Sequence, residues 1–294
     1  MTAYRFIDAE KAVHTVRRLC QALAVSRSAY YEWRARGEDE PADLALRVHV
    51  RAVHKANFGT YGRLRVTKAL RTEEGLTVNH KRVARIMREE GLAGVPRRRF
   101  RVSTTDSKHS RPVAPNLLQR DFTAPEPNKI WVSDVTYLRT SSGWAWLATV
   151  IDLFSRKVVG WAVAEHMRTE LCLEALRRAM VLRRPAPGLI LHSDRGAQYA
   201  SHAYGESCRA AGIVQSMSRA GDCWDNAVAE SFFGTLKQEL VRGRVWSSVP
   251  AARRDVGDYI HEFYNSRRLH GANGLRSPAA IEAEFNEAFR RHAA

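Results

Sequence analysis

Apolar residues in the first hundred positions recur at helical spacing, and no convincing strand occurs among them. A helix is predicted over 12–22, and a second short helix would follow and carry Tyr30, Tyr31 and Trp33. Two helices joined by a short turn are the arrangement that places the second helix in a major groove. The opening of the chain is therefore predicted to be a helix-turn-helix segment.

A second pair of helices is predicted over 62–74 and 79–90, with a turn at Gly75 and with Asn79 as the N-cap of the later helix. One face of that later helix is apolar, with Val83, Ile86 and Met87. Basic residues project around the rest of it: Lys81, Arg82, Arg85 and Arg88. The helix is predicted to bind DNA through them, and the alternative is that they are ordinary solvated side chains.

The pattern changes after position 125. Three strand-like runs cover 130–138, 144–153 and 157–163, and the last two are separated by a turn at 154–156 that suits a hairpin. Asp152, at that turn, is interpreted as a structural partner of the hairpin. The aromatic side chains of this part are assigned to the core rather than to base stacking: Trp144, Trp146, Trp161, Phe232 and Phe233.

A helix over 169–182, a strand over 188–193, a helix over 202–211 and a short strand over 213–216 come next. Three strands that can pair antiparallel, followed by helix, strand, helix and strand, are the order of an RNase H-like α/β fold. The fold class is therefore α/β, a mixed five-stranded sheet flanked by helices and preceded by an all-α helix-turn-helix region.

Five regions are expected along the chain. They are a helix-turn-helix segment (1–40), a second helical DNA-binding domain (41–100), a basic and proline-rich linker (101–124), an RNase H-like catalytic core (125–245) and a C-terminal helical extension (246–294). The linker assignment rests on the prolines after the basic run that includes Arg97, Arg98 and Arg99.

Charge strengthens the case for a nucleic-acid partner. The 294 residues include 47 Lys and Arg against 31 Asp and Glu, a net charge of +16, and residues 1–120 alone carry a net +13. The longest apolar run, 144–151, is far shorter than the ~20 residues of a membrane span, and no export signal begins the chain. A cytoplasmic location without membrane contact is expected. The four cysteines lack metal-binding spacing.

Three carboxylates are the candidate chemistry. Asp134 lies inside the first predicted strand, Asp194 ends a later strand, and Glu230 lies on a helix that begins near Asn226 and also carries Lys237 on the same face. Converging carboxylates repel each other unless a divalent cation lies between them, and oxygen ligands favour Mg²⁺ or Mn²⁺. A pair of ions would support phosphodiester cleavage and transfer. Isolated N-caps and surface ion pairs are the alternative for such residues.

The sequence around these residues carries a resemblance. It reads W-V-S-D-V-T-Y, then L-H-S-D-R-G-A-Q-Y, then D-N-A-V-A-E-S-F-F-G-T-L-K, with 35 residues between Asp194 and Glu230. This resembles the catalytic core of bacterial insertion-sequence DDE transposases of the IS3 family, second reading frame product, which are relatives of the retroviral integrases. The likeness extends from S-R-S-A-Y-Y-E-W near the start to F-Y-N-S-R-R-L-H near the end.

The resemblance implies that Asp134, Asp194 and Glu230 bind two Mg²⁺ or Mn²⁺ ions and that Lys237 approaches the DNA end. Further residues of the matching motifs are expected to shape the site or to contact DNA: His192, Arg195, Gln198, Tyr199 and Asn226. It also implies cleavage at the ends of an element, joining of the freed 3′-hydroxyl to double-stranded target DNA, and a homo-oligomer on that DNA.

Members of this family usually act as a frameshift fusion with an upstream reading frame product, so this chain is expected to be the downstream half, fused or separate. Two other functions stay open at this point. One is a non-catalytic, sequence-specific DNA-binding regulator, and the other is an RNase H-like nuclease that only hydrolyses.

Overall fold

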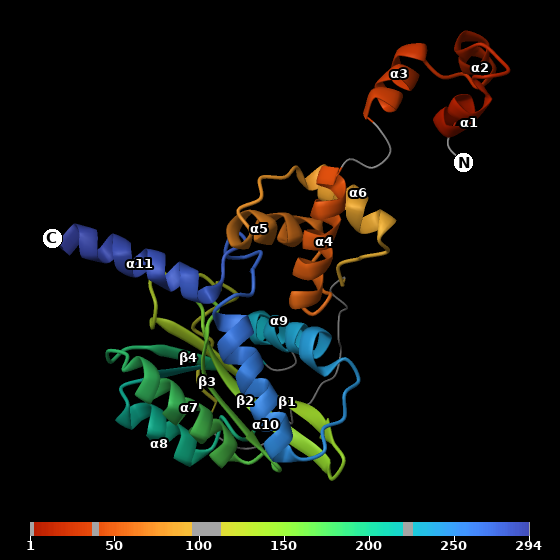
Figure 1. Cartoon of the computed structure of the whole chain (residues 1–294). Coiled ribbons are helices and arrows are strands. Elements are labelled where there is room, and N and C mark those ends of the chain that lie inside the picture. The colour runs from red at the N-terminus through yellow and green to blue at the C-terminus, as the bar shows by residue number, and fades with distance from the viewer. Residues whose placement is uncertain (1–2, 37–40, 96–112, 220–225, 294) are drawn as a thin grey trace. The chain divides into compact units, whose positions relative to one another are not determined.

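A computed structural model describes residues 3–36, 41–95, 113–219 and 226–293 of the chain (Figure 1). The chain divides into two compact units. One consists of Met1–Ala56 and Val66–Ala93, and the other of Asn57–Arg65 and Gly94–Ala294. No helix within the described ranges is long and apolar enough to cross a membrane.

The first three helices are α1 (Ala3–Glu10), α2 (Val16–Ala22) and α3 (Arg27–Arg36). The prediction of one helix over 12–22 is wrong at its start, because Thr15 caps α2 by accepting a hydrogen bond from the Arg18 amide. A separate helix, α1, precedes it. Their shared core is small and consists of Ile7, Leu19, Cys20 and Tyr30.

The next three helices are α4 (Pro41–Ala56), α5 (Arg63–Glu73) and α6 (His80–Glu89). The predicted cap of α6 is confirmed, since the Asn79 Oδ1 accepts a hydrogen bond from the Lys81 amide at 2.8 Å. The apolar face of α6 is buried as expected: Val83, Ile86 and Met87. Sequence reasoning missed α4.

The sheet of the second unit has five strands in the order β3-β2-β1-β4-β5. The strands are β1 (Ile130–Thr140), β2 (Gly143–Asp152), β3 (Val158–Ala164), β4 (Ile190–Ser193) and β5 (Val214–Met217). The first three pair antiparallel, whereas β4 pairs parallel with both β1 and β5. The predicted mixed five-stranded sheet is confirmed.

Helices cover both faces of this sheet (Figure 1). On β3, a Cβ at Gly160 would meet the Ala175 carbonyl of α7 (Thr169–Arg183), whereas the next residue, Trp161, contacts Gly257 of α10 (Val249–Asp258). Because consecutive strand residues point to opposite faces, α7 and α10 lie on opposite sides of the sheet. The helices α8 (His202–Ala210) and α9 (Ala227–Leu236) complete the core. Its α7 side includes Trp131, Val150, Leu171, Leu191 and Tyr204.

The helix α9 carries the apolar face that its sequence predicts, with Phe232, Phe233, Leu236 and Leu240 buried. Its last turn is a π-helix, η2 (Lys237–Val241). A second π-helical turn, η3 (Tyr259–Asn265), follows α10 directly, and α11 (Pro278–Ala293) ends the described chain.

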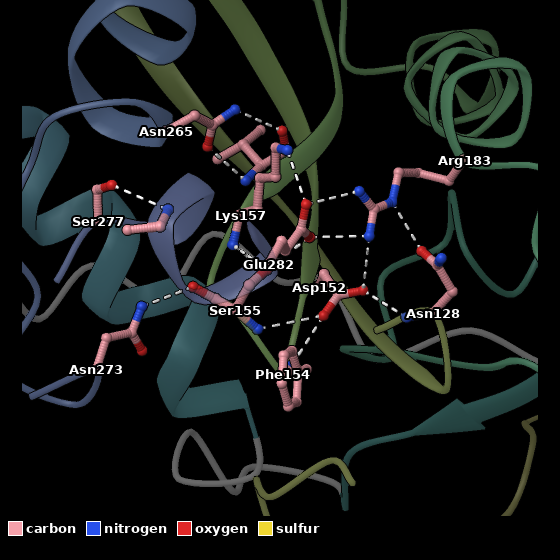
Figure 2. Close-up of polar contacts among 12 residues, drawn as sticks. Asn128, Asp152, Phe154, Ser155, Lys157, Arg183, Asn265, Asn273, Ser277 and Glu282 are labelled. Atoms are coloured by element: carbon pink, nitrogen blue, oxygen red, sulfur yellow. Dashed lines mark hydrogen bonds and ion pairs between the residues drawn. The ribbon is translucent and has the colours of Figure 1, made fainter. Parts of the chain in front are cut away.

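The C-terminal extension is attached to the β2–β3 hairpin by polar contacts (Figure 2). Glu282 of α11 accepts two hydrogen bonds from the Arg183 guanidinium, at 2.9 and 2.8 Å, one from Lys157 Nζ at 2.8 Å and one from the Ser155 hydroxyl at 3.0 Å. Burial raises the pKa of Glu282, but the bonds from Arg183 and Lys157 outweigh it, so the pKa is lowered overall.

Asp152 has the structural role in the hairpin that the sequence suggested. Its fully buried carboxylate accepts hydrogen bonds from the Asn128 amide at 2.7 Å and the Phe154 amide at 2.9 Å (Figure 2). The Trp131 indole donates a third, at 3.2 Å. Burial raises the pKa of Asp152, and these bonds together with Arg183 oppose the rise. This carboxylate therefore fixes the turn.

Candidate active site

The strand pairing brings two of the predicted carboxylates side by side. Parallel β1 and β4 pair Trp131 with Leu191 and Val132 with His192. Continuing this register by two residues on each strand brings Asp134 next to Asp194, which directly follows the end of β4. The carboxyl ends of parallel strands commonly carry functional groups in α/β sheets.

The charges of the predicted site act on one another. Burial raises the pKa of Asp134 well above its usual range, and the negative charges of Asp194 and Glu230 raise it further. The positive charge of Lys237 lowers it, as does the Val135 amide, which donates a hydrogen bond to the Asp134 Oδ1 at 2.8 Å. These side chains therefore share one electrostatic environment with an excess of negative charge.

Glu230 lies in the first turn of α9 with an exposed side chain, although the surrounding protein still raises its pKa by burial. Within the ranges that the structure describes, no three His, Cys, Asp or Glu side chains are grouped tightly enough to hold one metal ion. Joint chelation by the three carboxylates stays a prediction.

Lys237 lies where α9 passes into η2. Its Nζ is 4.5 Å from the centre of the Tyr137 ring on β1, and burial lowers its pKa while the charge of Asp134 opposes that shift. A lysine at this position places a positive charge beside the carboxylates.

His192 and Tyr199 hold in place the segments that carry Asp134 and Asp194. The two ring nitrogens of buried His192 lie 2.8 Å from the Ser216 hydroxyl and 3.2 Å from the Ser218 hydroxyl. The Tyr199 hydroxyl is 3.0 Å from the hydroxyl of Ser133, the residue before Asp134. Both side chains are buried, so their contacts are those of positioning residues.

Arg195, Gln198 and Asn226 use backbone partners. The Arg195 Nε donates to the Ser218 carbonyl at 2.6 Å, and the Gln198 Nε2 donates to the Met167 carbonyl at 3.0 Å. The helix α9 begins next to Asn226 as predicted, with Asn226 in the N-cap position, but its side chain makes no capping hydrogen bond. Its amide donates instead to the Ser133 carbonyl at 3.4 Å. It thereby links the start of α9 to β1 next to Asp134.

The predicted DNA-binding residues of α6 differ in their environment. Lys81 and Arg88 are exposed, whereas Arg82 and Arg85 donate to the carboxylate of Asp43 on α4, at 2.7 and 2.6 Å. Two of the four basic side chains therefore also hold α4 and α6 together. Arg97, Arg98 and Arg99 lie outside the described residues.

One aromatic assignment is wrong. Trp144 is 53% exposed, whereas Phe232 and Phe233 are buried and Trp146 and Trp161 are partly buried. Trp144 lies near the start of β2, beyond Trp146, the last residue at that end of β2 that pairs with β3. An apolar residue in a strand does not reveal whether a helix covers that end of the sheet.

The donor set fits a hard divalent cation. The groups around Asp134 that could bind an ion are carboxylate oxygens, and His192 is turned toward two serine hydroxyls. Oxygen ligands with excess negative charge suit Mg²⁺ or Mn²⁺.

Comparisons with known proteins match most of the chain to domain families. The integrase core domain family matches residues 124–223, a second integrase core domain family matches 211–278, and the HTH-like domain family matches 41–100. Among solved structures, the chain is similar to the HTLV-2 integrase catalytic core domain in complex with magnesium, with a TM-score of 0.43, 18% identity, and coverage of 54% of this chain and 99% of that one.

Curated relatives cover almost the whole chain. The uncharacterized 31 kDa protein of insertion element IS600 from Shigella sonnei is 39% identical over 271 residues, which are 92% of this chain and 99% of the relative. Transposase InsF for insertion sequence IS3A from Escherichia coli (strain K12) is 38% identical over 283 residues, which are 95% of this chain and 98% of the relative. The resemblance seen in the sequence is confirmed: the chain belongs to the transposases of IS3-type insertion sequences and carries their integrase core domain.

Proposed function

We propose that this transposase cuts DNA at the ends of its element and joins the freed 3′-hydroxyl to target DNA, with Asp134, Asp194 and Glu230 as its catalytic residues. The observation that carries the proposal is the register of the parallel strands β1 and β4, which leads to Asp134 and Asp194 at neighbouring positions, where the charges of Asp194 and Glu230 raise the pKa of Asp134. Excess negative charge beside the end of a parallel strand is what a divalent cation would neutralise.

The carboxylates would hold Mg²⁺ or Mn²⁺, and a pair of such ions would supply activation of the attacking oxygen and stabilisation of the leaving oxygen. Asp134 and Asp194 supply ligands from adjacent strands, and Glu230 supplies one from α9. Lys237 would bind a phosphate of the DNA end, since its ammonium group is near enough to Asp134 for the two charges to interact.

DNA binding by the helical region is the second part of the proposal. The HTH-like match covers α4, α5 and α6, and Lys81 and Arg88 are exposed on α6. Phosphate contacts of this kind fix a protein on the duplex without reading its sequence. We further propose that the protein acts as a homo-oligomer that holds two element ends, alone or with an upstream reading frame product.

The test is strand transfer of oligonucleotide duplexes that carry the ends of the element, with Mg²⁺ or Mn²⁺ present. Asp134→Asn, Asp194→Asn and Glu230→Gln should each abolish joined products and leave duplex binding nearly unchanged. Glu206→Gln, on the exposed surface of α8, is the matched carboxylate control and should stay active. Joined products from all three variants would refute the assignment of the carboxylates.

The same assay separates the other two functions. A nuclease that only hydrolyses would give shortened strands without joined ones, and a DNA-binding regulator would bind the duplex and give neither product.

A further inference from the structure

Three aromatic side chains form a surface at the hairpin end of β1 and β2. Tyr137 is paired with Trp146 across the two strands, and Arg139 is paired with Trp144. The Tyr137 ring meets the Trp144 ring edge to face at 5.0 Å and the Trp146 ring at 6.2 Å. Tyr137, Trp144 and Trp146 are called the aromatic surface below. Trp144 is 53% exposed, and the other two are partly exposed.

A hollow of about 430 Å³ adjoins this surface. Trp144 and Trp146 line it together with Ser142, Glu165 and Val249. Its volume falls within the range of ordinary ligand sites, roughly 300–1,000 Å³. The hollow therefore has room for a flat ring system beside the two indoles, and polar groups at its edge.

The aromatic surface lies further along the strand that carries Asp134. Tyr137 follows Asp134 by three residues on β1, which corresponds to about 10 Å along a strand, and this odd separation directs the two side chains to opposite faces of β1. Lys237 interacts with both the aromatic surface and the carboxylates, because its Nζ lies 4.5 Å from the centre of the Tyr137 ring and its charge acts on Asp134. A DNA strand held at the carboxylates would pass within reach of the aromatic rings.

Two cations adjoin the aromatic rings, and one carboxylate, that of Glu165, lines the hollow. Lys237 lies over Tyr137, and the exposed Arg139 is the cross-strand neighbour of Trp144. Aromatic rings combined with nearby cations are typical of sites for unpaired nucleic-acid strands, in which bases stack on the rings and phosphates meet the cations.

We propose that the aromatic surface stacks an unpaired nucleobase of the DNA strand whose phosphate lies at Asp134, Asp194 and Glu230, with Trp144 as the main stacking residue. The inference rests on the proposed function for the location of the DNA. It adds that the DNA end is locally unpaired when it occupies the site. Opening the last pairs would let the reactive strand approach the carboxylates alone.

The first test measures binding of a fluorescein-labelled twelve-nucleotide oligo(dT) by anisotropy, with EDTA present and with the full chain. Trp144→Ala should weaken binding about tenfold, whereas Trp144→Phe should change it less than about threefold, because base stacking depends on the ring. Binding of a blunt twelve-base-pair duplex should change less than twofold. Phe289→Ala removes an aromatic ring that is 65% exposed on α11, so it is the matched control and should bind like the unchanged protein. Equal oligo(dT) affinity for Trp144→Ala and Phe289→Ala would overturn the proposal.

The second test does not depend on a variant that folds. An oligo(dT) with one 5-iododeoxyuridine is crosslinked to the unchanged protein by long-wavelength ultraviolet light, and the crosslinked peptide is identified by mass spectrometry. Attachment at Trp144, Tyr137 or Trp146 supports stacking, and attachment only elsewhere contradicts it.

Both tests can fail independently of the proposed function. Neither requires a metal ion or cleavage, and Asp134→Asn should bind oligo(dT) at least as well as the unchanged protein. Loss of strand transfer in Asp134→Asn together with unaltered binding in Trp144→Ala would refute the stacking surface alone. Persisting strand transfer in Asp134→Asn together with weakened binding in Trp144→Ala would refute the carboxylate assignment alone.

Discussion

Asp134 illustrates at the scale of one residue how a catalytic arrangement costs stability. Burial and the charges of Asp194 and Glu230 raise its pKa, which means that the folded protein disfavours its ionised form. Above the usual carboxyl pKa the unfolded chain releases this proton more easily than the folded chain does. The ionised side chain therefore destabilises the fold at neutral pH.

Asp134→Asn should accordingly stabilise the protein at pH 7 in EDTA by about 1 kcal/mol, because it removes an ionised side chain that the folded state disfavours. Substitutions at functional sites commonly raise stability for this reason. Added Mg²⁺ should stabilise the unchanged protein by about 2–3 kcal/mol near a hundredfold excess over its dissociation constant, and the variant much less. Urea unfolding with and without Mg²⁺ measures both effects. A less stable variant in EDTA, or an equal gain from Mg²⁺ in both proteins, would contradict this explanation.

Sequence reasoning identified the carboxylates because their flanking residues form a recognisable pattern at a fixed spacing. It could not predict the exposure of Trp144, because strand alternation places a residue on a face of the sheet without showing where the covering helix begins. It placed Asn226 at the start of α9 but could not predict that its amide binds the Ser133 carbonyl of a strand 93 positions earlier. Contacts between distant segments decided both cases.

At the scale of elements, α11 is attached through one buried carboxylate. Glu282 lies among Arg183, Lys157 and Ser155, and its pKa is lowered overall although burial alone raises it. Because the folded-state pKa is depressed, this side chain stabilises the fold above its usual pKa, and the contribution is lost as the pH falls through the folded-state value.

Glu282→Ala should therefore destabilise the second unit by about 3–5 kcal/mol, because it leaves two cations without their buried partner. Glu284→Ala, on the same helix but with an exposed ion pair to Arg276, should cost less than about 1 kcal/mol. Thermal unfolding followed by circular dichroism at pH 7 compares the two. Similar midpoints for both variants would show that Glu282 does not anchor α11.

The strands and the helices α5, α6, α7 and α8 followed from hydrophobic periodicity, with ends shifted by one or two residues in most cases, whereas α1 and α4 were missed. The π-helical turns η2 and η3 did not follow from it, since the period of their apolar residues is close to that of an α-helix. The role of the C-terminal extension also had no local signal. It depends on Glu282 meeting Lys157, a residue 125 positions earlier in the chain.

At the scale of the whole molecule, the charge is distributed unevenly. The net charge of +16 lies mostly in the first 120 residues, which include α6 with its exposed Lys81 and Arg88. A strongly basic region attracts DNA over a distance and releases counterions on binding, so affinity should fall steeply with salt.

Lys81→Ala and Arg88→Ala should each reduce the slope of log affinity against log salt by about 1, as expected for the loss of one phosphate contact. Arg177→Ala, on the exposed surface of α7, is the control and should leave the slope unchanged. The affinity is measured by filter binding or anisotropy at salt concentrations from about 50 to about 300 mM. Identical slopes for all variants would show that α6 does not contact the phosphate backbone of DNA.

The most direct test of the central claim is a crystal grown with Mn²⁺ and measured for its anomalous scattering. The account predicts a peak bound by the carboxylates of Asp134 and Asp194, with Glu230 as a further ligand, at oxygen distances of about 2.0–2.2 Å. A Mn²⁺ peak elsewhere in the chain, with these three carboxylates unliganded at saturating Mn²⁺, would contradict it.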